Sequence, residues 1–242
     1  MNGIDKITQR IGADTQAEID RILAEFSAEA AAHREDIQWD YDTLVRLDLI
    51  FARGQLSYKM NAVRPEVRRD GAIHLRKARH PLLDPKTAVP IDIELGDTFD
   101  TLVITGPNTG GKTVTLKTIG LLTLMAQCGL HIPVGGDSRI TVFRRVLADI
   151  VDEQSIAQSL STFSGHMTTI VSIMHEVTPD DLVLFDELGA GTDPTEGAAL
   201  AQAILQRLLN IRVRTLATTH SRDRKSTRLN SSHQKISYAV FC

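Results

Sequence analysis

Apolar residues in the first quarter of the chain recur at helical spacing. Between Asp14 and Met60 the sequence has no proline and almost no glycine, and apolar side chains fall three or four positions apart. Examples are Ile19, Ile22, Leu23, Phe26, Leu44, Leu47, Ile50 and Phe51. The spacing predicts two long helices, the first beginning at Asp14 and the second capped within residues 40–42. We expect Trp39 and Tyr41 to pack between these helices.

The pattern changes between residues 61 and 100, where prolines separate short segments of β propensity. Pro65, Pro81, Pro85 and Pro90 interrupt the region, and residues 72–75 and 91–95 are its most strand-like segments. We therefore expect a small β-rich subdomain that leads into the rest of the chain.

From Thr101 onward, short apolar runs alternate with segments of helical period. Strands are predicted over 101–105, 146–150, 182–185 and 214–218, and helices over 113–127, 162–177 and 195–209. This alternation implies parallel strands joined by helical crossovers, so the fold class is α/β with a mostly parallel sheet. The expected organisation is a helical region over 1–60, the β-rich subdomain over 61–100, a core over 101–220 and a tail over 221–242.

Composition and charge narrow the function classes. The chain of 242 residues has 27 basic and 30 acidic residues and a net charge of −3, so no chain-wide basic field favours nucleic acid. Its cysteines, Cys128 and Cys242, form no disulfide framework and suit a reducing cytoplasm. No apolar stretch reaches the roughly 18 residues that a membrane span needs, and the polar start is no signal peptide. These features predict a cytoplasmic protein without a membrane partner.

A glycine-rich loop separates the predicted strand 101–105 from the helix that follows it. The pattern G-x-x-x-x-G-K-T is formed by Gly106, Pro107, Asn108, Thr109, Gly110, Gly111, Lys112 and Thr113. Glycines let consecutive backbone N–H groups point at phosphate oxygens, and the helix N-terminus adds partial positive charge. In such a loop the lysine reaches the β- and γ-phosphates and the threonine hydroxyl binds Mg²⁺. The loop predicts binding of a nucleoside triphosphate with Mg²⁺.

Two acidic residues directly follow the predicted buried strand 182–185, where an enzyme with such a glycine-rich loop needs carboxylates for Mg²⁺ and for the attacking water. Asp186 follows the strand 182–185 and is expected to hold Mg²⁺, directly or through water. Glu187 is the candidate general base that activates the attacking water. A solvated turn is the plain alternative for adjacent carboxylates. His220 directly follows Thr219 at the end of the strand predicted over 214–218. We expect it to sense the γ-phosphate. A lone histidine at a strand end is more often structural, and this is the alternative.

Taken together, several segments resemble the ATPase domain of the MutS family. The resemblance rests on the glycine-rich loop and on residues 161–167, 186–194 and 217–220, and it covers roughly residues 14–220. Residues 78–83, 130–134 and 152–156 are similar to the second MutS branch, bacterial proteins without a mismatch-reading N-terminal domain. The resemblance implies an ABC-type ATPase that uses ATP and Mg²⁺. A transporter-type or chromosome-maintenance ABC ATPase would carry an L-S-G-G-Q-type signature, which residues 161–165 do not form.

Within the MutS family, two nucleotide sites are completed across a homodimer. The resemblance implies that Ser161 or Ser164 contacts the partner's γ-phosphate, and it leaves that choice open. It implies that Gln154 is the Q-loop residue near Mg²⁺ and water. Thr192 and Asp193 belong, by the same resemblance, to a loop that crosses the dimer interface. A polar loop without function is the alternative for Gln154 and Asp193.

The resemblance also implies partners for a longer protein. The helices before Met60 match the lever and clamp base through which MutS proteins couple ATP state to their grip on nucleic acid. The expected targets are branched DNA, in suppression of homologous recombination, and stalled, collided ribosomes, and the family's nuclease lies in a further domain that is absent here. A mismatch-repair ATPase, or a fragment that binds nucleotide or dimerises without turnover, is the alternative. The polar tail over 221–242 is expected to be non-native read-through, with a basic nucleic-acid-binding tail as its rival.

Overall fold

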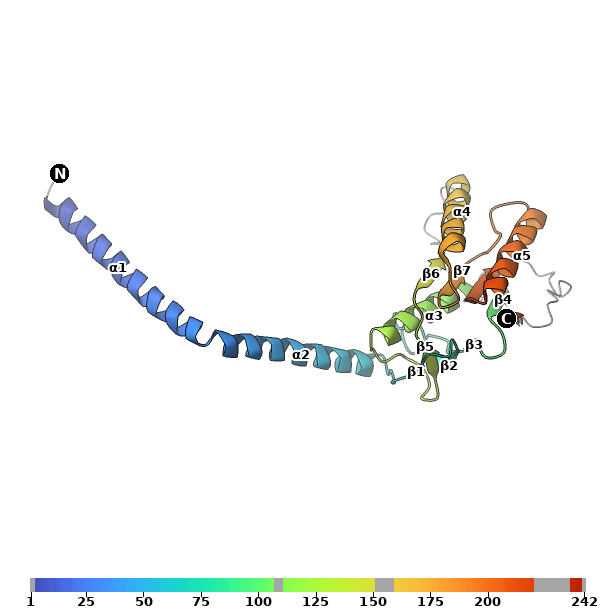
Figure 1. The fold of residues 1–242 in the computed structure, drawn as a ribbon, viewed down its shortest axis with the longest axis horizontal. Helices are drawn as coiled ribbons and strands as arrows, with labels where there is room; N and C mark the ends of the chain where they lie inside the picture. The colour runs from blue at the N-terminus through green and yellow to red at the C-terminus, as the bar shows by residue number, and fades with distance from the viewer. Residues whose placement is uncertain (1–2, 107–110, 151–158, 220–235, 241–242) are drawn as a thin grey trace. The chain divides into compact units, whose positions relative to one another are not determined.

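The computed structural model describes residues 3–106, 111–150, 159–219 and 236–240 (Figure 1). The chain forms two units, Met1–Gly54 and Gln55–Cys242, which we describe separately. In the described part of the chain, none of the helices combines the length and the apolar character that crossing a membrane requires.

The first unit is helical. Helix α1 spans Gly3–Ala32 and helix α2 spans Arg34–Lys59, so the second helix continues into the other unit. Helix α1 begins well before Asp14, and residues 40–42 lie inside α2, where Gln38 donates a hydrogen bond to Asp42 at 3.1 Å. Trp39 and Tyr41 are 69% and 63% exposed. The expected packing of these aromatic side chains between the helices is therefore wrong, because helical spacing reveals an apolar face but not what covers it.

A small mixed sheet opens the second unit. Its strands are β1 (Glu66–Arg68), β2 (Ile73–Ala78), β3 (Ile91–Leu95) and β5 (Arg139–Thr141), in the order β1-β5-β2-β3. Strand β2 is antiparallel to both β3 and β5, whereas β1 and β5 are parallel. The three-residue strand β5 comes from a region that the sequence pattern leaves without an element, so the small sheet draws on residues far beyond position 100.

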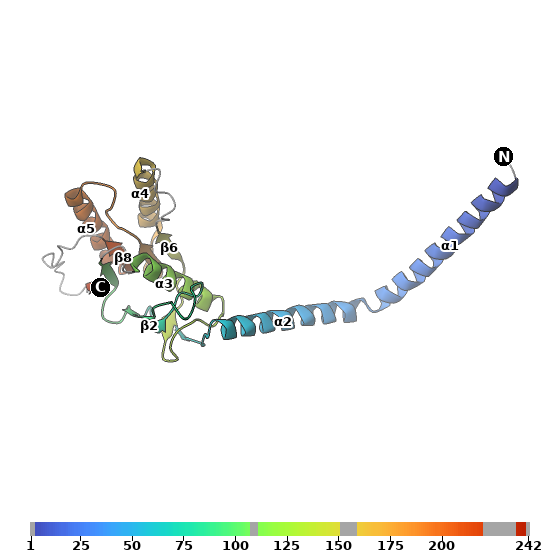
Figure 2. The same cartoon turned by 180° about the vertical axis from the view of Figure 1, so that it is seen from behind.

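The larger sheet is entirely parallel. It contains β6 (Val146–Asp149), β7 (Leu182–Phe185), β8 (Arg214–Thr219), β4 (Thr101–Thr105) and β9 (Ile236–Val240), in that order. Helices α3 (Lys112–Gln127), α4 (Ser159–Glu176) and α5 (Pro194–Ile211) connect the strands (Figure 2). The α/β class with a parallel sheet is confirmed.

Alternating side chains of this sheet enter two separate hydrophobic clusters. Leu102, Ile104, Leu182, Leu184 and Leu216 pack with residues of α3, including Leu116 and Ile119, and with the small sheet. Val103, Val183, Phe185 and Ala217 pack with residues of α4 and α5, including Ile173 and Leu205. Because helices cover both faces of the parallel sheet, its strands are continuous apolar runs, as in β7, where all four residues are buried.

Arg214, the first residue of β8, links the two sheets through hydrogen bonds. Its guanidinium donates to the Gly71 carbonyl at 2.7 Å and to Asp100 Oδ1 at 2.6 Å. Gly96 lies in the same contact with a φ of 100°, and a Cβ there would lie 2.3 Å from the Gly71 carbonyl oxygen. The junction thus requires glycine at position 96.

Strand β9 falls within the segment that we expect to be non-native. Its residues lie beside β4, with Ile236 opposite Thr101, whereas residues 220–235 are outside the described part. The origin of the tail remains a prediction.

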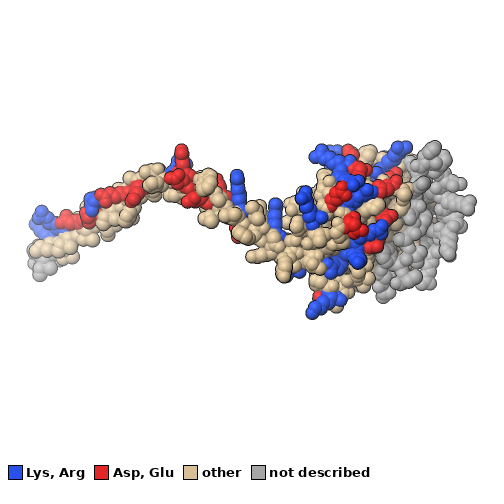
Figure 3. Space-filling model, turned by 90° about the horizontal axis from the view of Figure 1, so that it is seen from below, with Lys and Arg blue, Asp and Glu red and all other residues tan. Residues whose placement is uncertain are grey.

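Charged side chains of both signs are interspersed on the face of the Gln55–Cys242 unit shown in Figure 3. Ion pairs also link the strands of the small sheet, as Arg76 pairs with Glu94 at 2.7 Å. This arrangement agrees with the nearly balanced composition and gives that face no field of one sign.

Candidate nucleotide site

Parallel register brings the carboxyl ends of four strands to one edge of the large sheet. Thr105 pairs with Thr219, Phe185 with Ala217, and Asp149 with Phe185. Ligands of open α/β sheets bind at this edge, outside the carboxyl ends of the strands. The residues that follow β4 and β7 in sequence, which are the predicted site residues, therefore begin at the same edge.

Two glycines define the described ends of the loop between β4 and α3. Gly106 has a φ of 149° and Gly111, the N-cap of α3, has a φ of 72°, conformations that favour glycine. Lys112 is buried and its Nζ donates to the Gly106 carbonyl at 2.6 Å, so the ammonium group reaches back across the loop. Pro107, Asn108, Thr109 and Gly110 lie outside the described residues.

Thr113 and Asp186 meet although they are 73 positions apart in sequence. The Thr113 hydroxyl donates to Asp186 Oδ2 at 2.7 Å, and the Thr218 hydroxyl donates to Oδ1 at 2.5 Å. Asp186 is 5% exposed, and its backbone N–H donates to the Asp149 carbonyl at 2.8 Å. Two hydroxyl groups thus donate to a buried carboxylate at this edge of the sheet.

The pair Thr113 and Asp186 offers the kind of oxygen ligands that Mg²⁺ prefers. Among the side chains that the structure describes, no three or more histidines, cysteines, aspartates or glutamates gather into a metal-binding group. Mg²⁺ commonly takes only one or two protein ligands when phosphate oxygens and water supply the rest. The donor set therefore fits an ion that arrives with a nucleotide.

Glu187 occupies a strained backbone position directly after Asp186. Its φ is 49°, in the left-handed region that non-glycine residues rarely adopt. Its N–H donates to the Thr218 hydroxyl at 2.8 Å, and the Leu188 N–H donates to the Thr218 carbonyl at 2.9 Å. Strain of this kind persists only where neighbours over-determine it, and it clusters at functional sites.

The edge also holds a pair of side chains, Asp149 and His166, to which the sequence patterns assign no individual role. His166 Nδ1 on α4 donates to both carboxylate oxygens of Asp149, at 3.0 and 3.1 Å. Burial raises the pKa of Asp149, His166 opposes that shift, and the charge of Asp186 adds to it. Asp149 lies within the predicted strand 146–150 and ends the observed strand β6, so its place in the sheet follows from the sequence, whereas its partner depends on the path of α4.

The predicted signature residues begin helix α4. Ser161 is the third residue of α4 and Ser164 lies in its second turn, where it is exposed. The side chain of Ser161 is outside the described part, as are Gln154 and His220 altogether. Their roles remain predictions.

Asp193 caps helix α5. Its side chain accepts hydrogen bonds from the N–H groups of Thr195 at 2.9 Å and Glu196 at 3.4 Å, and Pro194 occupies the first helical position. Thr192 donates to Glu196 Oε2 at 3.3 Å. The structure thus shows a capping role within the chain, and the role at a dimer interface stays a prediction.

A close approach of two glycines fixes the loop before α5. Gly189 has a φ of 85°, and a Cβ there would lie 2.3 Å from the Gly197 carbonyl oxygen. A Cβ at Gly197 would lie 2.0 Å from the Gly189 carbonyl oxygen. The loop that follows Asp186 and Glu187 is therefore pressed against the first turn of α5.

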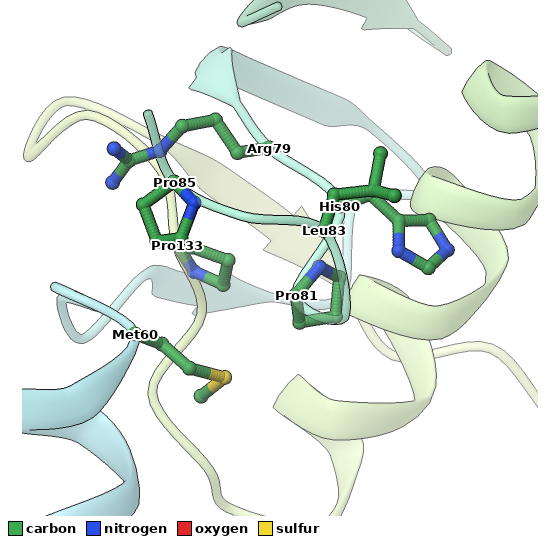
Figure 4. Close-up of a pocket in the computed structure, with 7 residues that line it drawn as sticks. All are labelled: Met60, Arg79, His80, Pro81, Leu83, Pro85 and Pro133. Carbon is green, nitrogen blue, oxygen red and sulfur yellow. The ribbon is translucent and has the colours of Figure 1, made fainter. Parts of the chain in front are cut away.

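A small pocket joins the segments around residues 78–83 and 130–134. It is lined by Met60, Arg79, His80, Pro81, Leu83, Pro85 and Pro133 (Figure 4). The Arg79 N–H donates to the Pro133 carbonyl at 3.0 Å. Burial, with the positive charge of Lys117, lowers the pKa of His80. The pocket is mostly apolar and contains none of the predicted site residues.

The family known as MutS domain V matches residues 102–240. The chain belongs to the MutS family. The match begins at the second residue of β4 and includes the glycine-rich loop, Asp186 and Glu187, so the resemblance inferred from the motifs is confirmed.

Curated MutS relatives are similar over most of the chain. Endonuclease MutS2 of Lachnoclostridium phytofermentans is 59% identical over 205 residues, which are 85% of this chain and 26% of that protein. The Endonuclease MutS2 proteins of Lachnospira eligens and Caldanaerobacter subterraneus subsp. tengcongensis are 60% identical over 204 residues and 56% over 216. These alignments cover 84% and 89% of this chain and 26% and 27% of those proteins.

The relatives place the chain in the MutS2-type branch, as residues 78–83 and 130–134 predict. An alignment of 205 residues is longer than the domain V match and therefore continues outside residues 102–240. The chain spans about a quarter of the length of these relatives, and their endonuclease name describes the longer proteins.

Proposed function

We propose that the chain is the Mg²⁺-dependent ATPase module of a MutS2-type protein. The observation that carries the proposal is the contact between Thr113 and Asp186 at 2.7 Å, beside a loop that Lys112 closes. Thr113 lies at the start of α3 and Asp186 directly after β7, and their contact at one edge of the sheet supports a site for phosphate and metal there. Membership of the MutS family supports ATP as the nucleotide.

Lys112 and the N-terminus of α3 bind the phosphates in this proposal. The buried ammonium group exchanges its hydrogen bond with the Gly106 carbonyl for phosphate oxygens, which carry more negative charge. The N-terminus of α3, which begins at Lys112, adds the partial positive charge of a helix end, which favours phosphate oxygens. Thr113 and Asp186 are the protein ligands of the metal.

Mg²⁺, when bound, neutralises charge on the β- and γ-phosphates. Glu187 accepts the proton of the attacking water, and the hydrogen bonds that the Glu187 and Leu188 N–H groups donate to Thr218 fix the backbone that carries its side chain. Positioning and electrostatics supply most of the catalysis of phosphoryl transfer, so a strained but well-held glutamate suits the task. His220 senses the γ-phosphate and Gln154 orients water near the metal in the same proposal.

The proposed active form is a homodimer with composite sites. The start of α4 faces a partner's γ-phosphate in this proposal, and Ser161 or Ser164 makes the contact, since a serine hydroxyl and a helix N-terminus both favour phosphate oxygens. Thr192 and Asp193 lie in the loop that reaches the interface. A single chain is then expected to bind ATP more readily than it hydrolyses it.

The longer protein acts, in this proposal, on branched DNA or on stalled ribosomes, with ATP state coupled to its grip through α1 and α2. The MutS2 names of the relatives favour this branch over a mismatch-repair ATPase. A nucleotide-binding or dimerising fragment without turnover is the second candidate, since the chain spans only about a quarter of those relatives.

The test compares phosphate release by the wild type, Glu187→Gln and the control Glu94→Gln. Glu94 is an exposed glutamate of strand β3 that pairs with Arg76, away from the site. We expect Glu187→Gln to lose turnover while it keeps ATP binding, and Glu94→Gln to match the wild type. Undiminished hydrolysis by Glu187→Gln would remove the base from the proposal.

Protein concentration separates the two candidates in the same assay. A rate per chain that rises with wild-type concentration supports composite sites in a dimer. Binding of ATP without phosphate release at every concentration supports the fragment without turnover.

A further inference from the structure

The hydroxyl group of Thr218 bonds to two consecutive residues of the site. It donates to Asp186 Oδ1 and accepts from the Glu187 N–H at 2.8 Å. The carbonyl group of Thr218 accepts from the Leu188 N–H at 2.9 Å. One residue of β8 thus holds three successive residues at the end of β7.

The surroundings of Thr218 make these bonds consequential. Its side chain is fully buried, and β8 runs parallel to β7 with Ala217 opposite Phe185. A hydroxyl group has one donor and two acceptor sites, and here it is used in both senses. Loss of the hydroxyl would take a hydrogen bond from a carboxylate oxygen of the buried Asp186, which costs more than the bond itself contributes, and would remove the bond that the Glu187 N–H donates.

Thr215 on the same strand bonds differently from Thr218. It is also fully buried, but its hydroxyl donates to the Val213 carbonyl of its own strand at 3.3 Å. A buried threonine in β8 can therefore satisfy its hydroxyl without contacting β7.

We propose that Thr218 is a positioning residue that holds Asp186 for Mg²⁺ and Glu187 for the attacking water. The inference rests on the proposed ATPase function. Thr113 and Asp186 are both proposed metal ligands, so their mutual bond must loosen when the ion binds. Thr218 is not a proposed ligand, so its bond to Oδ1 persists through that exchange and keeps the carboxylate oriented.

The left-handed conformation of Glu187 gives Thr218 a second task. The Glu187 N–H donates to the hydroxyl group of Thr218, and the Leu188 N–H donates to its carbonyl group. These bonds offset the strain of the φ of 49° at Glu187 and direct the chain away from β7 at this residue.

The test uses Thr218→Val, which keeps the shape and removes the hydroxyl, Thr218→Ser, which keeps the hydroxyl, and the control Thr215→Val. Melting temperatures are measured for each chain alone, with ATP and EDTA, and with ATP and Mg²⁺. The extra stabilisation by Mg²⁺ over EDTA reports metal binding without any turnover. We expect Thr218→Val to lose at least half of that increment, and Thr218→Ser and Thr215→Val to keep it.

Turnover gives a second readout of the same variants. We expect Thr218→Val to lower kcat about tenfold, as loss of a buried hydrogen bond to a charged group implies, and to change KM for ATP less than about twofold. Thr218→Ser should recover most of kcat. If Thr218→Val does not fold, Thr218→Ala against Thr218→Ser carries the same comparison.

A Thr218→Val chain that melts lower but keeps the Mg²⁺ increment and kcat would overturn the inference, since a purely structural role predicts that result. A Thr218→Ser chain as impaired as Thr218→Val would also overturn it. A wild type with neither an Mg²⁺ increment nor hydrolysis would overturn the proposed function and this inference together.

Discussion

The carboxyl edge of the parallel sheet and the two N-terminal helices place the same kinds of residue in opposite surroundings. At the edge, Leu184 and Phe185 are at most 1% exposed and the polar residues beyond them bond to one another. In α2, Trp39 and Leu44 are 69% and 65% exposed, and the helix has no buried residue. The sheet contains its own core, whereas the helices present apolar faces whose packing partners must come from elsewhere.

The largest expected difference between the two regions is the effect of removing a leucine. Leu184→Ala should lower the free energy of unfolding by about 3 kcal/mol, because Leu184 packs in the cluster of α3 and its truncation leaves a cavity. Leu44→Ala should change it by less than about 0.5 kcal/mol. Urea unfolding followed by circular dichroism measures both. Equal losses would show that Leu44 is buried in solution.

The second largest expected difference between the two regions is the effect of removing a lysine on ATP binding. Lys112→Ala removes the buried ammonium group at the loop, and we expect it to weaken ATP binding about 100-fold, as loss of a charged hydrogen-bonding group implies. Lys59→Ala, at the exposed end of α2, should bind ATP as the wild type does. Titration calorimetry measures the ATP affinity of the wild type and of both variants. Equal affinities for the wild type, Lys112→Ala and Lys59→Ala would exclude Lys112 from the phosphate site.

Acid should destabilise the sheet through Asp181, which precedes β7 and has a fully buried side chain. Burial alone would raise the pKa of Asp181, but hydrogen bonds from Arg145 and Thr178 outweigh it and lower the pKa below its ordinary value of 3.8. A lowered folded pKa gives stability that is present above about pH 4 and lost as the pH falls through the folded pKa.

Asp181→Asn should therefore lower the stability at pH 7 by about 2 kcal/mol and flatten its decline below pH 4. Asp180→Asn, at the exposed neighbouring position, is the matched control and should leave both unchanged. Urea unfolding at a series of pH values measures the effect. An Asp181→Asn curve parallel to the wild type would mean that another carboxylate governs the acid response.

The smallest expected effect belongs to the cap of α5. Asp193→Ala should cost about 1 kcal/mol of stability, whereas Asp193→Asn should cost little, because asparagine caps helices as well as aspartate does. Thermal melts measure the difference. A loss of concentration-dependent ATPase activity in Asp193→Asn, without loss of stability, would reveal a second role for the charge at the dimer interface.

Much of the core is predictable from sequence because its signals are local. The strands Thr101–Thr105 and Leu182–Phe185 have the predicted bounds, since both are apolar runs with polar residues or glycine directly after them. Helix α5 extends to Ile211, two residues beyond the prediction, before Arg212 adopts a φ of 61°. The contact between Thr113 and Asp186 follows once β4, which precedes the glycine-rich loop and α3, and β7, which precedes Asp186, lie in one parallel sheet.

Other features depend on contacts that no local pattern records. Strand β5 is three residues long and gains its place by pairing with β1 and β2. The Asp149–His166 pair and the bonds of Thr218 depend on which strands are neighbours. The exposure of Trp39 differs from the prediction because a helical period cannot show whether a second surface is present.

The central claim is that the carboxyl edge of the parallel sheet binds ATP together with Mg²⁺. Its most direct test is the ATP affinity of the wild type and of Asp186→Asn, each measured by calorimetry with Mg²⁺ and with EDTA. Asparagine keeps the size of the side chain and an oxygen acceptor, but it removes the charge that holds the ion. The account predicts that the wild type binds ATP more tightly with Mg²⁺ and that Asp186→Asn loses this difference. An Asp186→Asn chain with the full Mg²⁺ dependence of the wild type would contradict it.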